Sequence, residues 1–166
     1  MPAARTMLAL LLLQLLVACG GIQSLVPQQS TLSDVRDRMG RPTDIRFDAA
    51  GNELWEYAAG PAGEVTWLVR ATRDGRVLDA TQLLTPAQFS RIQRGVSTKA
   101  QVRDLLGRPS EQEYFGAEAV WSWRMRISPQ RGHYAVRFDR EGVAIETLTL
   151  MDASGDQRDG GDRGGR

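Results

Sequence analysis

An internal repeat limits what this chain can fold into. When the sequence is shifted by 67 positions, residues 30–44 align with residues 97–111, and eight of the fifteen aligned pairs are identical. The same shift places Trp67 on Tyr134, and the similarity extends over nearly all of the chain after residue 21. A repeat of this length predicts two copies of one small structural unit instead of one larger domain.

The second copy shows how each unit is expected to begin. Thr85-Pro86 is typical of a helix start, and Gly95 ends that first short helix. A second helix follows, because Thr98 and Gln101 have the spacing of a capping box and Gly107 is placed to end the helix. In the first copy the first helix is reduced to residues 21–26.

Gln28 stands where the second copy has Gly95. We therefore expect a tighter or less regular turn at Gln28.

Three alternating segments then follow in each copy and predict strands. Their bounds are 53–57, 67–71 and 76–80 in the first copy, and 120–125, 134–138 and 143–150 in the second. Alternate residues share one face of a strand, so the aromatic side chains gather on one side of each sheet. These are Trp55, Tyr57 and Trp67 with Val69, and Trp121, Trp123, Tyr134 and Phe138 with Val136. The predicted fold class is α+β, with two tandem ααβββ units, each two helices packed on a three-stranded antiparallel sheet. Stacking of these rings on a ligand is the alternative to packing in a core.

The N-terminal residues resemble a bacterial lipoprotein signal. An apolar run of about eleven residues after Arg5 is shorter than the roughly 20 residues of a membrane-spanning helix. It ends in Leu-Val-Ala-Cys, which is similar to a lipobox and implies cleavage before Cys19 and lipid attachment to its thiol. An ordinary signal peptide with an incidental cysteine is the alternative. The residue after Cys19 is not Asp, and the sorting pattern of such lipoproteins then implies the outer membrane, with the protein facing the periplasm.

Four segments are expected along the chain. They are a signal peptide at 1–18, a first unit at 19–84, a second unit at 85–152 and a disordered tail at 153–166. The tail has no apolar residue beyond Ala153, so it cannot bury enough surface to offset the entropy of ordering it.

Composition argues against several functions. A formal net charge of +1 lacks the positive surplus of a nucleic-acid binder. One Cys and one His support neither a disulfide scaffold nor a metal site. Because His133 is the sole histidine, every catalytic pairing with a histidine depends on it. We predict no enzyme, no catalytic residues, no metal, no cofactor and no small-molecule substrate.

Four sequence elements together resemble one known family. They are Gly95-Val96-Ser97, the helix end at 102–109, Trp121 and Glu141-Gly142-Val143. This combination is similar to the small-protein-A and outer-membrane-lipoprotein-A (BamE-like) family. The resemblance implies two helices on a three-stranded sheet, and a lipoprotein that binds partner proteins in the periplasm without catalysing a reaction. The two-unit layout is similar to that of β-lactamase inhibitor proteins, in which two such sheets form a concave surface.

A partner-binding surface is expected on the strand faces opposite the aromatic residues. Those faces carry Glu56, Arg70, Arg124 and Arg137, and arginine is enriched at protein interfaces. The first hypothesis is a periplasmic protein-binding module in β-barrel assembly, with the assembly machine as a candidate partner, or in envelope integrity. The alternatives are an inhibitor of a secreted hydrolase and a structural lipoprotein that contacts phospholipid.

Overall fold

The computed structural model describes residues 22, 25–60, 63–127 and 129–152. The predictions for the signal peptide 1–18, for Cys19 and for the tail 153–166 concern residues outside these ranges. The chain forms two compact units, which divide between Thr81 and Gln82, and the segment Ala59–Thr66 groups with the second unit.

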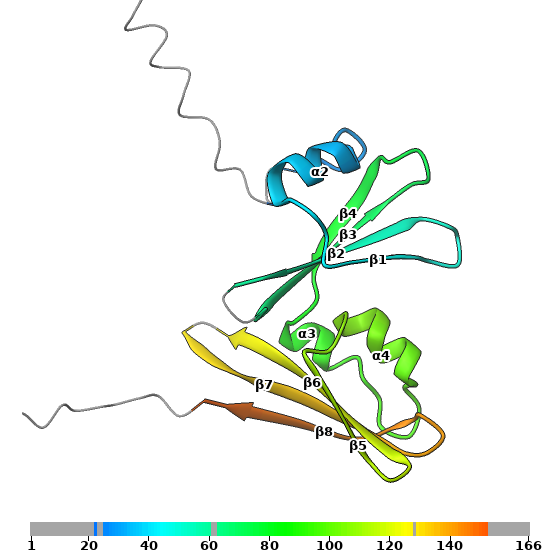
Figure 1. Cartoon of the computed structure of the whole chain (residues 1–166), viewed down its shortest axis with the longest axis vertical. Coiled ribbons are helices and arrows are strands. Elements are labelled where there is room, and N and C mark those ends of the chain that lie inside the picture. Colours follow the sequence, from blue (N-terminus) through cyan, green and yellow to red (C-terminus); the bar gives the residue numbers. More distant parts are fainter. Residues whose placement is uncertain (1–21, 23–24, 61–62, 128, 153–166) are drawn as a thin grey trace, which may run out of the picture. The chain divides into compact units, whose positions relative to one another are not determined.

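The first unit contains one described helix and a four-stranded sheet in the order β1-β2-β3-β4 (Figure 1). The elements are α2 (Leu32–Met39), β1 (Asp44–Phe47), β2 (Glu53–Ala59), β3 (Val65–Ala71) and β4 (Val77–Gln82). Its core lies between helix and sheet. The buried members are Leu32, Val35, Trp55, Tyr57, Val69, Ala71 and Val77.

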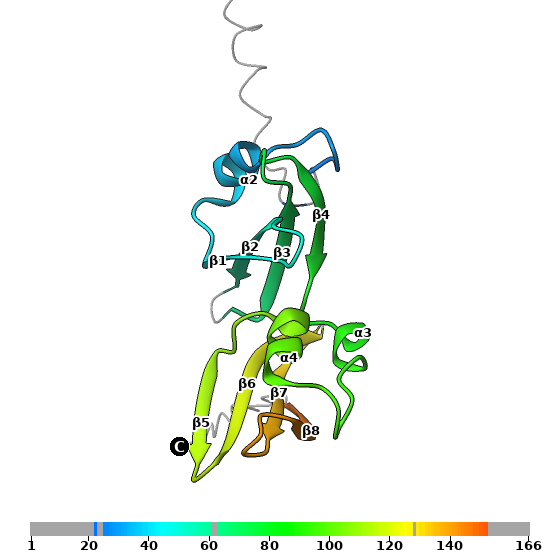
Figure 2. The ribbon, with the colours of Figure 1, turned by 90° about the vertical axis from the view of Figure 1, so that its right-hand side faces the viewer.

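The second unit contains two helices and an antiparallel sheet in the order β5-β6-β7-β8 (Figure 2). The elements are α3 (Pro86–Phe89), α4 (Lys99–Leu106), β5 (Glu111–Phe115), β6 (Glu118–Ile127), β7 (Gln130–Phe138) and β8 (Ala144–Met151). Its core includes Phe89, Val102, Leu106, Trp123, Tyr134, Val136 and Phe138.

The α+β class is therefore confirmed, but the prediction of three strands per sheet is wrong. Each sheet has a fourth strand at its edge, β1 in the first unit and β5 in the second. All five residues of β5 are exposed. A strand with no buried face needs no alternation of apolar and polar residues, and that alternation is the signal from which a strand is predicted. Its pairing with β6 defines this strand instead. In the first unit, the short helix expected at 21–26 falls partly on residues that the structure does not describe.

Hydrogen bonds recur at the offset found in the sequence. The N–H of Leu32 donates to the carbonyl of Gly75 over 2.8 Å, and 67 residues later the N–H of Lys99 donates to the carbonyl of Gly142 over 2.9 Å. Isolated bridges join Thr31 to Arg76 and, at the same offset, Thr98 to Val143. Each helix is thus attached at its N-terminal end to the turn and strand that close its unit.

The C-terminal ends of α2 and α4 are also attached in the same way. Gly40 and Gly107 end these helices with φ of 77° and 76°. The hydroxyl of Tyr57 donates to the carbonyl of Gly40 over 3.4 Å. In the second unit the indole N–H of Trp123 donates to the carbonyl of Gly107 over 3.1 Å. Two rings predicted as core residues therefore also satisfy the carbonyl at each helix end.

The turn at Gln28 is not irregular, contrary to the expectation. Gln28 has φ of 66° and Gly95 has φ of 77°, so both take the left-handed conformation. The N–H of Gln28 donates to the carbonyl of Val77, and the N–H of Gly95 donates to that of Ala144, each over 2.8 Å. The hydrogen bond to the last strand holds the same turn in both units, and the glutamine carries the conformational cost.

This cost predicts opposite effects for two substitutions. Gln28→Gly removes the left-handed penalty and should raise the free energy of unfolding by roughly 0.5–1 kcal/mol, because the greater freedom of glycine in the unfolded chain offsets part of the gain. Gly95→Gln should lower it by about 1 kcal/mol. No atom lies within 4 Å of a side chain built at Gly95, so the loss would be conformational and not steric. Urea unfolding followed by circular dichroism measures both changes.

Gln29→Gly is the matched control. Within the described ranges, Gln28 is the sole non-glycine residue with positive φ, so Gln29 has no left-handed penalty to lose. Gln29→Gly should therefore lower stability. If Gln28→Gly and Gln29→Gly changed stability equally, the conformational explanation would be wrong.

The two helix caps differ in one titratable group. In the first unit the carboxylate of Asp34 accepts from the backbone N–H of Thr31 over 2.7 Å and from its hydroxyl over 2.8 Å. The backbone N–H of Thr98 donates instead to the neutral amide oxygen of Gln101, over 2.9 Å. Both hydrogen bonds from Thr31 lower the pKa of Asp34 below its ordinary value of 3.8, and the bond from the backbone N–H has the larger effect.

A lowered pKa in the folded state means that the stabilisation by Asp34 is complete above the unfolded pKa and is lost as pH falls through the folded one. Asp34→Gln gives the first unit the neutral cap of the second. The difference in unfolding free energy between the native protein and this variant should therefore shrink between pH 5 and pH 2. Denaturant titrations at several pH values measure it, and a constant difference would contradict the assignment. Gln101→Asn, which shortens an uncharged cap, is the control and should show no such pH dependence.

Candidate protein-interaction surface

The sheet of the second unit has one covered face and one open face. Helices α3 and α4 lie over one side, where the buried aromatic residues gather (Figures 1 and 2). The strand register assigns alternate residues to the opposite side. We call these residues the outer face: Glu111, Glu113, Phe115, Glu118, Val120, Ser122, Arg124, Arg126, Arg131, His133, Ala135, Arg137, Glu146, Leu148 and Leu150.

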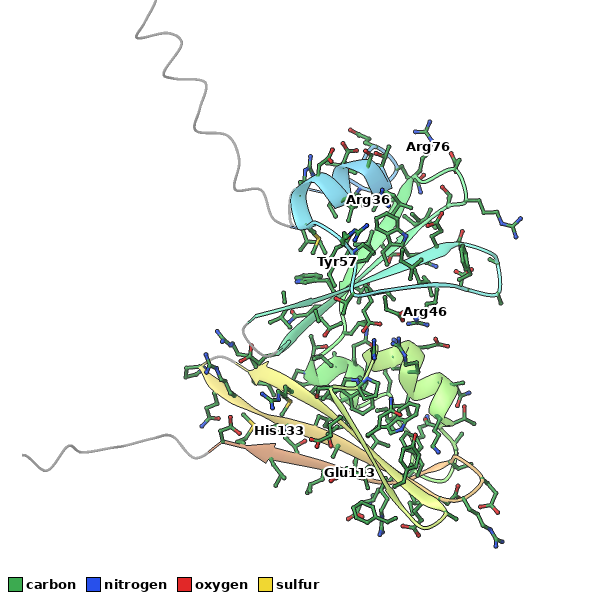
Figure 3. All side chains as sticks on the ribbon, viewed as in Figure 1. Arg36, Arg46, Tyr57, Arg76, Glu113 and His133 are labelled. Carbon is green, nitrogen blue, oxygen red and sulfur yellow. The ribbon has the colours of Figure 1, made fainter. Side chains whose placement is uncertain are left out.

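The part of the outer face on β6 to β8 combines apolar side chains with a basic one. Leu148 is 48% exposed and Leu150 is 55% exposed. Leu148 is paired with Ala135, and Leu150 with His133, which in turn faces Arg124 on β6. His133 is labelled in Figure 3. We call these five residues the β8 patch.

The arginines of the outer face differ in their surroundings. Arg137 is held by two carboxylates, with Nη1 lying 3.6 Å from Oε2 of Glu118 and Nη2 lying 3.1 Å from Oε2 of Glu146. Arg124 is exposed, and no ion pair of its guanidinium group with another described residue is found. Arg124 is therefore the arginine of the outer face whose charge is most available to a partner.

A buried carboxylate lies at one end of the second unit. Glu64 has a side chain only 5% exposed, and its Oε1 lies 3.3 Å from Nε of Arg131 and 3.8 Å from Nη2 of Arg126. Two outer-face arginines are thus directed toward an internal partner. Because both arginines pair with Glu64, less of their charge is available at the surface.

The four predicted contact residues do not lie together on one accessible surface. Arg124 and Arg137 lie on the same sheet face, as expected. Arg70 belongs to the first unit, where its guanidinium group forms an ion pair with Asp79, with Nε 2.9 Å from Oδ2. Glu56 is only 2% exposed, so its carboxylate does not contribute to an accessible surface.

The leucines of β8 and the aromatic residues of β5 were not predicted as contact residues. The signal for the leucines is the alternation Glu146-Thr-Leu-Thr-Leu150, which places both on the face away from the core. Tyr114 and Phe115, 66% and 61% exposed, gave no comparable signal, because the segment that contains them was not predicted to be a strand.

The predicted core role of the aromatic residues agrees with the structure. Trp123 is 1% exposed and Phe138 is fully buried. Tyr134 stacks on Phe89 with ring centroids 4.1 Å apart, and its burial raises the pKa of its hydroxyl. Burial also raises the pKa of Tyr57 in the first unit. Rings in these positions are not accessible for stacking on a ligand.

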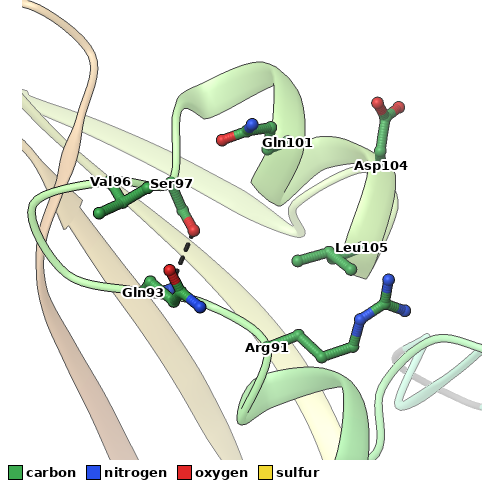
Figure 4. A pocket seen from close by; sticks show the side chains of 7 residues that line it. All are labelled: Arg91, Gln93, Val96, Ser97, Gln101, Asp104 and Leu105. Atoms are coloured by element: carbon green, nitrogen blue, oxygen red, sulfur yellow. Dashed lines mark hydrogen bonds between the residues drawn. The ribbon is translucent and has the colours of Figure 1, made fainter.

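A shallow groove lies beside α4 in the second unit (Figure 4). It has a volume of about 350 Å³ and is lined by Arg91, Gln93, Val96, Ser97, Gln101, Asp104 and Leu105. The hydroxyl of Ser97 accepts from the backbone N–H of Gln93 over 2.9 Å, so this hydroxyl is used inside the loop. The open shape and the mixed lining do not define a pocket for a particular small molecule.

The described ranges lack two features that would indicate other kinds of site. No group of three or more His, Cys, Asp or Glu side chains in these ranges is arranged to hold a metal ion. None of the helices described is long and apolar enough to cross a membrane.

The second unit is thus a two-helix, four-stranded α+β domain with one open sheet face. Residues 82–147 match the family model described as "Outer membrane protein assembly factor BamE domain". The resemblance that the sequence motifs carried is therefore confirmed for this part of the chain. No curated protein sequence matches the chain significantly.

Three solved structures are similar to the chain at low identity. A DUF4309 family protein (YjgB) from Bacillus subtilis subsp. subtilis str. 168 is 14% identical, with a TM-score of 0.31, 78% of this chain covered and 84% of that one. A putative β-lactamase inhibitor protein from Streptococcus mutans is 9% identical, with a TM-score of 0.34 and coverages of 75% and 88%. An extracellular protein containing an SCP domain from Bacillus anthracis str. Ames is 13% identical, with a TM-score of 0.32 and coverages of 80% and 46%.

Proposed function

We propose that this chain is a lipid-anchored protein-binding module on the periplasmic face of the outer membrane, where it acts in β-barrel protein assembly or in envelope integrity. The observation that carries the proposal is the match of residues 82–147 to the BamE domain of assembly factors. A binding role is supported by the open sheet face of the second unit, which carries exposed apolar and basic side chains.

The β8 patch is the proposed contact surface for a folded partner. Two half-exposed leucines on β8 share one sheet face with the exposed Arg124 on β6, and His133 and Ala135 of β7 lie between them. Such apolar groups bordered by charge are typical of interaction sites, and arginine is frequent among the residues that dominate binding energy. Arg137 lies on the same face, but its two carboxylate partners reduce the charge that it offers.

The tandem arrangement and the anchor complete the proposal. Recurring hydrogen bonds at an offset of 67 residues support two BamE-like units that arose by duplication, one in 19–84 and one in 85–152. After cleavage, the lipid-bearing Cys19 would be the first residue of the mature chain. It lies only three residues before Ile22, whose side chain packs against the core of the first unit. The first unit is then held close to the membrane surface.

A charge and polarity reversal on the β8 patch tests the contact surface. The double variant Arg124→Glu, Leu150→Glu should recover roughly tenfold less partner than the native protein when each is captured from crosslinked envelopes and its partners are identified by mass spectrometry. Both side chains are exposed, so the unfolding free energy should change by less than about 0.5 kcal/mol.

Arg140→Glu is the matched control, because Arg140 is an exposed arginine in the turn between β7 and β8, outside the outer face. It should leave partner recovery unchanged. Equal recovery with the double variant and with this control would exclude the β8 patch as the contact surface. Capture of proteins that take no part in β-barrel assembly or envelope integrity would contradict the assigned process.

The anchor has its own test. Cys19→Ser removes the thiol that accepts the lipid, so the protein should lose metabolic labelling with palmitate and should leave the membrane fraction. Ser24→Ala changes a nearby hydroxyl and should alter neither. Retention of the label in Cys19→Ser would show that the lipid is attached elsewhere.

A further inference from the structure

The edge strand β5 is the most exposed strand of the second unit. Its five residues are all exposed, and it forms one border of the sheet, paired with β6 on its inner side. In the portion of the chain that the structure describes, no strand pairs with its outer side. An edge strand of this kind presents backbone N–H and C=O groups with which another chain can pair.

The side chains of β5 divide into two rows. Glu111, Glu113 and Phe115 belong to the outer face, spaced by about 6–7 Å along the strand. Gln112 and Tyr114 point to the other side, where the Tyr114 hydroxyl donates to Oε1 of Gln112 over 3.1 Å. Glu113 is labelled in Figure 3. The hydrogen bond fixes an exposed aromatic ring beside the edge, although exposure of this ring to water is unfavourable.

The charge on the outer row is not neutralised within the unit. Among the described residues, no ion pair is found for the carboxylate of Glu111 or of Glu113, whereas Glu118 on the next strand is paired with Arg137. Two like charges at alternate positions also oppose pairing of β5 with β5 of a second copy, because an antiparallel pair would place carboxylates opposite carboxylates. The same charges would repel an anionic lipid surface.

We propose that β5 is a strand-addition site for an extended segment of a partner protein that carries Lys or Arg at alternate positions and an apolar residue two positions before them. In an antiparallel arrangement the basic residues face Glu113 and Glu111, and the apolar residue faces Phe115. Tyr114 contacts the other side of the added strand. This inference rests on the proposed role as a protein-binding module, and it adds a second surface and the chemistry of its partner.

The first unit provides an internal comparison. At the offset of 67 residues, Asp44 and Arg46 on β1 occupy the positions of Glu111 and Glu113. The edge of the first sheet therefore lacks the uniform negative row. Glu113→Arg gives β5 the charge pattern of β1 and is the central variant of the test.

The probe is a labelled synthetic peptide with Leu, Lys and Lys at alternate positions separated by Thr. Its binding to the purified mature lipoprotein in detergent is followed by fluorescence anisotropy. Glu113→Arg and Glu111→Lys should each weaken binding roughly tenfold or more. Glu141→Arg, the same kind of change at an exposed carboxylate in the turn between β7 and β8, should leave it within about twofold. A peptide with Glu in place of Lys should bind only the double variant Glu111→Lys, Glu113→Arg.

Backbone methylation separates strand addition from simple charge attraction. Alternate N–H groups of an added strand face β5, and the others face solvent. Methylation of one alternate set should abolish binding, while methylation of the other set should leave it intact. Equal tolerance of both sets, absence of binding, or a second copy of the chain as the occupant in sedimentation would each overturn the proposal. These results are independent of the β8-patch test, since a partner lost in Arg124→Glu, Leu150→Glu would support that surface even if the peptide failed to bind.

Discussion

The attachment of each helix to the last strand of its own unit determines the rest of the structure. In the second unit the N–H of Lys99, the first residue of α4, donates to the carbonyl of Gly142, and the N–H of Ala144 donates to the carbonyl of Ser97. The indole of Trp123 holds the other end of the helix through Gly107. With both ends fixed, α4 covers one face of the sheet, and the outer face stays open for other molecules.

Residues that start and stop the helices made much of this fold predictable from sequence. Thr98, Gln101 and Gly107 act locally, so their spacing alone indicates a capping box and a helix end, and both are present. The aromatic alternation likewise identified the core side of each sheet, because burial on one face leaves a period of two along the strand.

The remaining features depend on contacts that a local pattern does not contain. β5 forms by pairing with β6 and carries no apolar alternation, so the sequence pattern does not predict a strand there. Gln28 keeps a left-handed turn because Val77 accepts its N–H, and Val77 is far away in the sequence. The candidate contact residues were chosen because alternate side chains of a strand point to opposite faces, and this rule placed Arg124 and Arg137 correctly on one face. The alternation did not reveal that Glu56 is buried or that Arg137 forms ion pairs with Glu118 and Glu146.

β1 and β5 occupy the same position in their units, and this has a consequence for which substitutions such a protein tolerates as it evolves. The two units share the hydrogen bonds that hold helix to strand, yet they differ in charge at the same position of their edge strands, Arg46 in one and Glu113 in the other. Substitutions on the exposed edge strand β5 do not involve those internal bonds. The edge strand of one unit can therefore change its charge without loss of the helix-to-strand bonds in either unit.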